Sequence, residues 1–204
     1  MRFLWGTDSF QGITVAIKGI TGKVGPSLAE DLASRGAKLI GSYWEQEKGK
    51  EEKVERMIKE FGVKIVSDQD IFRQKYDILS LNAIGKDLNS RTIPLIPKGT
   101  IVGGAANNQL AEPRDYWGDV LFENGVWYIP DFVINLGGVV NVSDELKKGG
   151  YNETRAMRNI KVVEINVPWI LSRAQIQRVS PHRIADMLPR AAIKEARQNK
   201  YEIK

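Results

Sequence analysis

Hydrophobic residues along the chain fall into short runs that alternate with segments of helical spacing. The runs are rich in β-branched residues and bounded by turn residues, so they predict strands over 13–17, 37–43, 76–81, 100–103 and 126–129. Leu28 and Leu32 stand four apart, which predicts a helix over 25–35 that Gly36 ends. A second amphipathic helix is predicted over 51–61, where Val54, Met57, Ile58 and Phe61 share one face.

This alternation predicts an α/β fold with a mostly parallel, doubly wound, Rossmann-like sheet. The pattern becomes mostly helical from Asn152 onward. We therefore expect one α/β domain over residues 12–150, followed by a helical C-terminal segment over 151–204 that packs on it.

The stretch VAIKGITGKVG, residues 15–25, joins the first predicted strand to the first predicted helix. Its glycines, Gly19, Gly22 and Gly25, have the spacing of a dinucleotide-binding loop that reads G-x-x-G-x-x-G. In such a loop the first glycine makes a tight turn, the second lets the backbone approach a pyrophosphate, and the third lets helix and strand pack closely. An ordinary strand-to-helix turn is the alternative. Within the loop, the candidate cofactor-binding positions also include Thr21, Lys23 and Val24.

The end of the second predicted strand bears on the choice between NAD and NADP. NAD enzymes usually carry an acid there, which holds the adenosine ribose. Here the strand ends in Ser42 and Tyr43, and the first acid is Glu45. Ser42 with Lys48 could accept a 2′-phosphate, Glu45 could reach back to the ribose, or these could be ordinary loop residues. The sequence leaves the cofactor as NAD or NADP.

Composition narrows the class of protein. Of the 204 residues, 42% are hydrophobic and 27% are charged, which is typical of a soluble globular domain. The sequence contains no cysteine, so disulfides and thiolate sites are excluded, and we expect no metal site. The net charge of +5 comes from basic residues interspersed with acids, which does not favour nucleic-acid binding. No apolar run approaches a membrane span and no secretory signal is recognisable, so we expect a cytoplasmic protein.

Three downstream segments resemble the leucine/phenylalanine branch of the glutamate, leucine, phenylalanine and valine amino acid dehydrogenases. They are GGAANNQLAEPRD (103–115), YIPDFVINLGGVVNVSDEL (128–146) and YNETRAM (151–157). The resemblance implies a substrate domain followed by a cofactor domain, with residues 1–11 as the end of the interdomain helix and this chain as the second domain only. It implies oxidative deamination of an amino acid, with hydride passing to a nicotinamide. The family's catalytic lysine and aspartate fall in the absent domain, so the resemblance implies no catalytic residue here and a possible split partner subunit.

The resemblance also assigns site residues. Asn82 and Ala83 match positions that touch the cofactor riboses, Asn107 and Asn108 match a turn beside the nicotinamide, and Asn135 matches an asparagine near nicotinamide and substrate. Val139 and Val142 match positions that line the substrate side-chain pocket, together with Asn135. The loop departs from the family pattern, because Thr21 is an extra residue and Lys23 replaces an asparagine.

Each assignment has a simpler rival. The asparagines could close turns or cap helices, and the two valines could be core residues of a helix. The one histidine, His182, follows a proline at a predicted helix start and is expected at the surface or as a cap. At the level of function, the rivals are a non-catalytic NAD(P)-binding module and a degenerate relative that binds no ligand.

Overall fold

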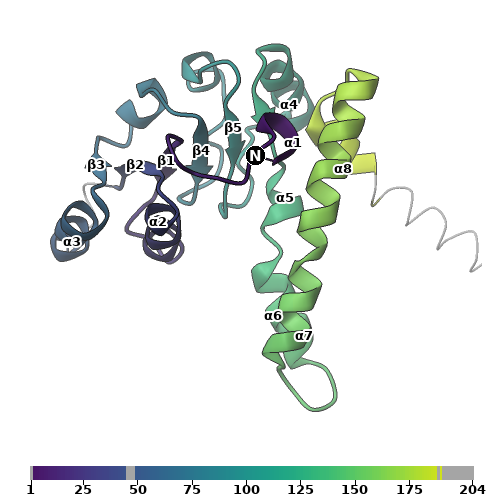
Figure 1. The fold of residues 1–204 in the computed structure, drawn as a ribbon. Coiled ribbons are helices and arrows are strands. Elements are labelled where there is room, and N and C mark those ends of the chain that lie inside the picture. Colours follow the sequence, from purple (N-terminus) through teal and green to yellow (C-terminus); the bar gives the residue numbers. More distant parts are fainter. Residues whose placement is uncertain (1, 45–48, 188, 190–204) are drawn as a thin grey trace, which may run out of the picture.

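The computed structural model describes residues 2–44, 49–187 and 189. Its centre is a six-stranded sheet in the order β3-β2-β1-β4-β5-β6, with every neighbouring pair parallel (Figure 1). The strands are β1 (Thr14–Lys18), β2 (Lys38–Ser42), β3 (Lys64–Ile65), β4 (Ile78–Leu81), β5 (Ile101–Gly103) and β6 (Trp127–Tyr128). The strand order reverses between β1 and β4, which is where ligands bind in open α/β sheets. The predicted Rossmann-like fold is confirmed.

The five predicted strands are all present, and their bounds differ from the prediction by one or two residues at an end. The sixth, β3, escaped prediction because it is two residues long and pairs only with Ile40 and Gly41 of β2. The register aligns the carboxyl ends, since Lys18 of β1 pairs with Ser42 of β2 and with Leu81 of β4. The loops that follow these strands therefore meet at one edge.

Helices cover both faces of the sheet, as a doubly wound fold requires. On one face, Val15 and Ile17 pack with helix α2 (Gly25–Ser34) and helix α3 (Glu51–Phe61). On the other, Ala16 faces the 3₁₀ turns η1 (Asp70–Arg73) and η2 (Ile93–Leu95) and helix α4 (Arg114–Glu123). Adjacent strand residues point to opposite faces, so the apolar run of β1 is buried on both sides.

The helical region begins earlier than predicted. Four helices follow β6: α5 (Asp131–Ile134), α6 (Gly137–Glu145), α7 (Glu153–Ile160) and α8 (Val162–Gln177). A further helical segment covers 181–187. Val133 of α5 packs with Ile170 of α8, whereas α6, α7 and the adjoining end of α8 project away from the sheet (Figure 1). Among the described residues, no helix is long and apolar enough to cross a bilayer.

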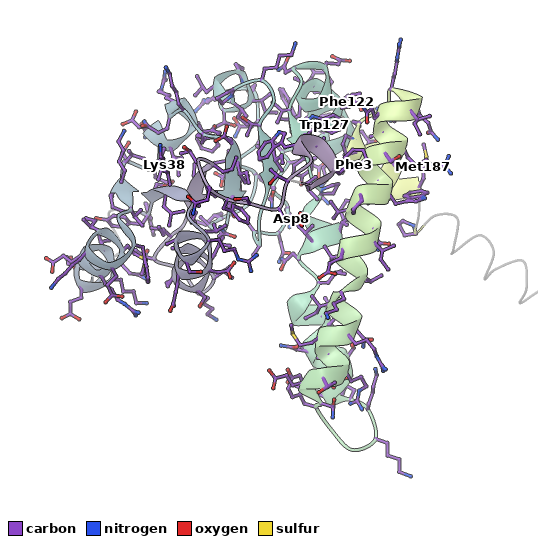
Figure 2. The ribbon with its side chains drawn as sticks, in the orientation of Figure 1. Phe3, Asp8, Lys38, Phe122, Trp127 and Met187 are labelled. Atoms are coloured by element: carbon purple, nitrogen blue, oxygen red, sulfur yellow. The ribbon has the colours of Figure 1, made fainter. Side chains whose placement is uncertain are left out.

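At the N-terminus, the expected end of an interdomain helix is one helical turn, α1 (Arg2–Trp5), followed by an irregular segment up to β1. Phe3 and Asp8 lie on the side of the sheet that faces α8 (Figure 2). With α2, α8 and the sheet, they line a cavity of about 970 Å³. The N-terminal segment therefore crosses the part of this sheet face that α2 leaves open.

Candidate functional site

The three loop glycines have three different environments. Gly19 has a φ of 81°, and a Cβ there would lie 3.0 Å from the Ala83 backbone nitrogen, so this tight turn requires glycine. A Cβ on Gly25 would lie 2.2 Å from the Ile20 carbonyl oxygen, because α2 begins directly against that backbone. Gly22 is less confined: its φ is not positive, and its nearest neighbour would be the Gly19 oxygen at 3.2 Å. Gly19 thus makes the tight turn and Gly25 the close packing that the spacing predicts, while the pyrophosphate role of Gly22 stays a prediction.

The start of α2 is open to an anion. Among the described residues, no hydrogen-bond acceptor pairs with the backbone N–H groups of Lys23, Val24 and Gly25. Helix α2 carries no acid in its first turn, and the side chains of Lys23 and Val24 are exposed. Free N–H groups and the helix dipole favour negative charge at this end. Thr21 differs from these neighbours, because its side chain is buried and its carbonyl oxygen accepts a hydrogen bond from Lys50 Nζ at 3.3 Å.

Ser42 does not fit the role of a donor to a 2′-phosphate. Its side chain is fully buried, and its Oγ donates to Asp68 Oδ1 at 3.0 Å. The expectation overlooked that Ser42 is the last paired residue of β2 and points to the face opposite α2. Tyr43 is half-buried and Trp44 is 58% exposed, so both can border an adenosine site. Glu45 and Lys48 lie outside the described residues.

A charged cluster that the sequence analysis did not identify lies beside the glycine loop. Lys18, the last residue of β1, is buried, and its Nζ lies 2.7 Å from Asp68 Oδ2 and 3.4 Å from Asp87 Oδ1. The other Asp87 oxygen, Oδ2, is buried without a hydrogen-bond partner in the described part of the chain. Burial raises the pKa of Asp87 to about 6, although Lys18 opposes the shift. The cluster joins the segments after β3 and β4 to the end of β1.

Replacing Asp87 by asparagine should change how stability depends on pH. The usual pKa of the group is 3.8, so between about pH 4 and 6 the folded chain holds a proton that the unfolded chain has lost. Stability from this group therefore falls as pH rises through that window, and the loss is complete above it. We expect Asp87→Asn to be more stable than wild type at pH 7.5 by roughly 1–3 kcal/mol and nearly equal at pH 4. Urea unfolding at both pH values measures this, and an equal difference at both would contradict it.

Asn82 connects the ends of β4 and β5. Its Nδ2 donates to Ser80 Oγ at 2.9 Å, and its Oδ1 accepts from the Ala105 N–H at 2.9 Å. Its backbone oxygen faces Gly22, at 3.9 Å from where a Cβ would stand. Ala83 packs against Gly19. The resemblance assigned Asn82 and Ala83 to ribose contacts. In the structure the Asn82 side chain bonds to Ser80 and Ala105, so a ribose contact stays a prediction for the Asn82 backbone and for Ala83.

The other asparagines form a second hydrogen-bonded group. Asn135, at the end of α5, donates from Nδ2 to the Ala105 carbonyl oxygen at 2.8 Å and to Asn107 Oδ1 at 2.7 Å. The Ala105 carbonyl only accepts, so it fixes the orientation of both amides. Within the described residues, Asn107 Nδ2 and Asn135 Oδ1 are left without partners. One free donor and one free acceptor therefore remain on two amides that are joined by a hydrogen bond.

Asn108 makes a different set of hydrogen bonds, which fix the turn. Its side-chain Oδ1 accepts from Arg114 Nη2 at 3.0 Å, its N–H donates to Asp131 Oδ2 at 2.7 Å, and its carbonyl oxygen accepts from the Lys86 N–H at 2.6 Å. Its φ is 54°. Asparagine is one of the few non-glycine residues that adopt this conformation readily. Asn108 therefore closes the turn, as the rival reading of the asparagines expected.

Val139 and Val142 lie on one face of α6 and are 70% and 58% exposed. This exposure argues against core packing, the simpler reading of the two valines. Asp144, on the opposite face of α6, is fully buried and accepts hydrogen bonds from Arg155 of α7, which lower the pKa of Asp144 to about 2. The ion pair fixes α6 against α7 and leaves the valine face free. Gly137 and Gly138 begin α6 with open space around them.

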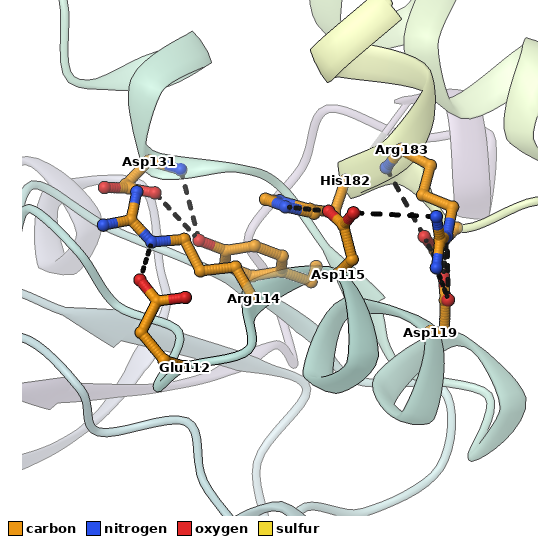
Figure 3. Close-up of polar contacts among 9 residues, drawn as sticks. Glu112, Arg114, Asp115, Asp119, Asp131, His182 and Arg183 are labelled. Atoms are coloured by element: carbon orange, nitrogen blue, oxygen red, sulfur yellow. Dashed lines mark hydrogen bonds and ion pairs between the residues drawn. The ribbon is translucent and has the colours of Figure 1, made fainter.

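The prediction for His182 was wrong. Its ring is buried, 6% exposed, against Gly118 of α4 and the rings of Tyr128 and Phe132. Its Nε2 lies 3.3 Å from Asp115 Oδ1 (Figure 3), and its buried Nδ1 has no partner within the described residues. Burial lowers the pKa of His182. The histidine packs the C-terminal helical segment onto α4, and the sequence could not show that the contact existed.

The groups described above lie on a continuous path along the carboxyl edge of the sheet. Gly22 faces the Asn82 backbone, Asn82 bonds to Ala105, and Ala105 bonds to Asn135. The cavity between α2 and α8 reaches this path, because Val24, Asn82, Gly104 and Ala105 are among its lining residues. No group of three or more His, Asp or Glu side chains in the described ranges is placed to hold a metal ion.

Comparison with known proteins gives a consistent result. A family model described as Glutamate/Leucine/Phenylalanine/Valine dehydrogenase matches residues 4–154. Leucine dehydrogenase of Geobacillus stearothermophilus is 38% identical over 194 residues, which are 95% of this chain and 50% of that protein. Phenylalanine dehydrogenase of Lysinibacillus sphaericus is 35% identical over 177 residues, 86% of this chain and 44% of its own length. The crystal structure of L-tryptophan dehydrogenase from Nostoc punctiforme superposes with a TM-score of 0.85 at 31% identity, covering 97% of this chain and 56% of that one.

Proposed function

Because the chain belongs to the Glutamate/Leucine/Phenylalanine/Valine dehydrogenase family, we propose that it is the NAD(P)-binding part of an amino acid dehydrogenase. The chain spans about half the length of the curated relatives it matches. We propose that the complete enzyme oxidatively deaminates a branched-chain or aromatic amino acid, with the other half supplying the catalytic residues. The observation that carries the proposal is the continuous path from the Gly22 backbone to the free amide groups of Asn107 and Asn135.

The phosphate end of the site is the glycine loop. Gly22 leaves the space that a side chain would fill, and the N–H groups of Lys23, Val24 and Gly25 are free to donate to a pyrophosphate. The exposed Lys23 adds a positive charge at the same place. The backbone N–H donors of this loop are thus already free to bond to a dinucleotide, and no side chain has to move to free them.

The nicotinamide end is the asparagine pair. A carboxamide has one carbonyl acceptor and one NH₂ donor, and the pair leaves the complementary groups free: Asn107 Nδ2 to donate and Asn135 Oδ1 to accept. The nicotinamide, when bound, supplies the hydride acceptor. Val139 and Val142, exposed on α6, would border an apolar amino acid side chain.

The proposal requires that the 204-residue chain alone turns over no amino acid. General-base catalysis needs a group within hydrogen-bond reach of the reacting amine or its water, and we assign no such residue in this chain. We expect no NADH formation above a no-enzyme control with leucine, valine, phenylalanine or tryptophan and either cofactor. The same preparation should bind NADH, which shows that it is folded. Turnover in a preparation free of host dehydrogenases would contradict the proposal that the other half of the enzyme supplies the catalytic residues.

Tyr43 gives a test of cofactor choice. It stands at the position where an acid would favour NAD and repel the 2′-phosphate of NADP. Without that acid we expect the two cofactors to differ in affinity by less than about tenfold, or ~1.4 kcal/mol. Tyr43→Asp should shift the ratio of dissociation constants toward NAD, and Tyr43→Asn is the uncharged control. A strong wild-type preference for NAD that Tyr43→Asp leaves unchanged would show that another residue reads the ribose.

A further inference from the structure

The first residue of the short helix α5 and the residue that follows this helix hold the turn at 105–108, which carries the proposed nicotinamide contacts. Asp131 begins α5 and Asn135 follows its last residue. Asn135 bonds to the first part of the turn, at Ala105 and Asn107, and Asp131 bonds to its later part, at Asn108. The turn is therefore fixed at two points by a single rigid element.

The Asp131 carboxylate is itself oriented. Its Oδ1 accepts from the Tyr128 hydroxyl at 3.0 Å, while its Oδ2 accepts from the Asn108 N–H at 2.7 Å. Tyr128 is 1% exposed, and burial raises its pKa, so its hydroxyl remains a donor at neutral pH. Figure 3 shows Asp131 beside Arg114, whose Nη2 donates to Asn108 Oδ1 at 3.0 Å. Hydrogen bonds to charged groups are the strong ones.

The Asn108 backbone needs such a partner. Its φ of 54° is less favourable than a right-handed conformation, and a backbone held there must be fixed by its surroundings. The segment around Lys86 lies against the other side of the turn, because a Cβ on Gly85 would be 2.3 Å from the Asn107 oxygen. Asp131 supplies the one bond to the Asn108 N–H among the described residues.

We propose that Asp131 is a positioning residue for cofactor binding: it fixes Asn108, and thereby aims the free Asn107 amide at the nicotinamide carboxamide. This inference rests on the proposed function. Asp131 acts through the turn and does not itself contact the cofactor. Its effect should therefore be confined to the nicotinamide half of the dinucleotide, since the adenosine half lies toward the glycine loop and β2.

The experiment compares NADH with AMP, which lacks the nicotinamide half. For Asp131→Ala we expect NADH to bind about tenfold or more weakly, the loss of one charged hydrogen bond, with AMP affinity within about twofold of wild type. Asp131→Asn keeps an acceptor for Asn108 and should retain NADH affinity within about threefold of wild type. Asp119→Ala is the matched control, because Asp119 pairs with Ser180 and Arg183 and touches no part of the turn.

Amide hydrogen exchange gives a readout without ligand. In Asp131→Ala the Asn108 N–H should exchange faster, while the amides of β1 and β4 keep their wild-type rates. Equal NADH affinity in wild type and Asp131→Ala would overturn the positioning role and leave the proposed function intact. Equal weakening of AMP and NADH would overturn it too, because the effect would be global. A wild-type chain that binds AMP and NADH equally, or binds neither, would overturn the proposed nicotinamide site itself.

Discussion

Gly25→Val is expected to destabilise the domain by about 3–5 kcal/mol, a large part of the stability of a typical domain. The added Cβ would lie 2.2 Å from the Ile20 carbonyl oxygen and 2.5 Å from the Ile20 carbonyl carbon. Both are backbone atoms, so the clash can be relieved only by moving α2 away from β1. Urea unfolding followed by circular dichroism measures the change in the free energy of unfolding.

The matched control is Gly137→Val. Gly137 is the first residue of α6, as Gly25 is of α2, but apart from its chain neighbours and its own helix backbone no atom of the described residues lies within 4 Å of where its Cβ would stand. The same substitution at a helix start should there change stability by less than about 1 kcal/mol. Equal effects at the two positions would show that helix propensity, and not the contact with Ile20, makes Gly25 necessary.

Gly22→Val is expected to separate binding from folding. The valine Cβ would lie 3.2 Å from the Gly19 oxygen, a crowding that a shift of a few tenths of an ångström relieves, and 3.9 Å from the Asn82 oxygen, which is an ordinary contact. The rest of the side chain would fill the space over the loop that a pyrophosphate needs. We expect NADH affinity to fall at least about 100-fold, or ~2.7 kcal/mol, with stability within about 1 kcal/mol of wild type.

Two results would contradict this expectation. If the variant binds NADH as tightly as wild type, the loop is not the phosphate site. If it unfolds, the space above Gly22 is part of the packed fold and not a ligand site. Gly22→Ala has a smaller side chain at the same point and should lose less NADH affinity than Gly22→Val. The loss of affinity should therefore increase with the size of the side chain.

The sequence predicted the sheet and the loop because both depend on local patterns. Alternating β-rich runs and helical spacing located five strands, and the glycine spacing located the turn between β1 and α2. Strand β3 was missed because two residues carry no periodicity. Helix α5 was missed because the proline before it and the asparagine after it are turn signals, whereas α6 was expected only in the alternative interpretation that puts Val139 and Val142 on a helix.

The site was harder to predict because its side chains are oriented by distant partners. The sequence around Ser42 does not show that its hydroxyl donates to Asp68, which lies on another loop. The sequence around His182 does not show that this residue is buried against Gly118. A charged residue at the end of an apolar strand, Lys18, was a signal for the cluster with Asp68 and Asp87, but its partners depend on strand order. Asn107 and Asn108 are adjacent in sequence and differ in the residues that the fold places against them, which are Asn135 for Asn107 and Arg114 for Asn108.

Titration of the wild-type chain with NADH and NADPH in a calorimeter tests the central claim most directly. The account predicts saturable binding of one dinucleotide per chain, competition by AMP, and a loss of the binding signal in Gly22→Val while the variant remains folded. Absence of heat with either cofactor at millimolar concentration, from a chain that unfolds cooperatively, would contradict the claim that this domain binds a dinucleotide.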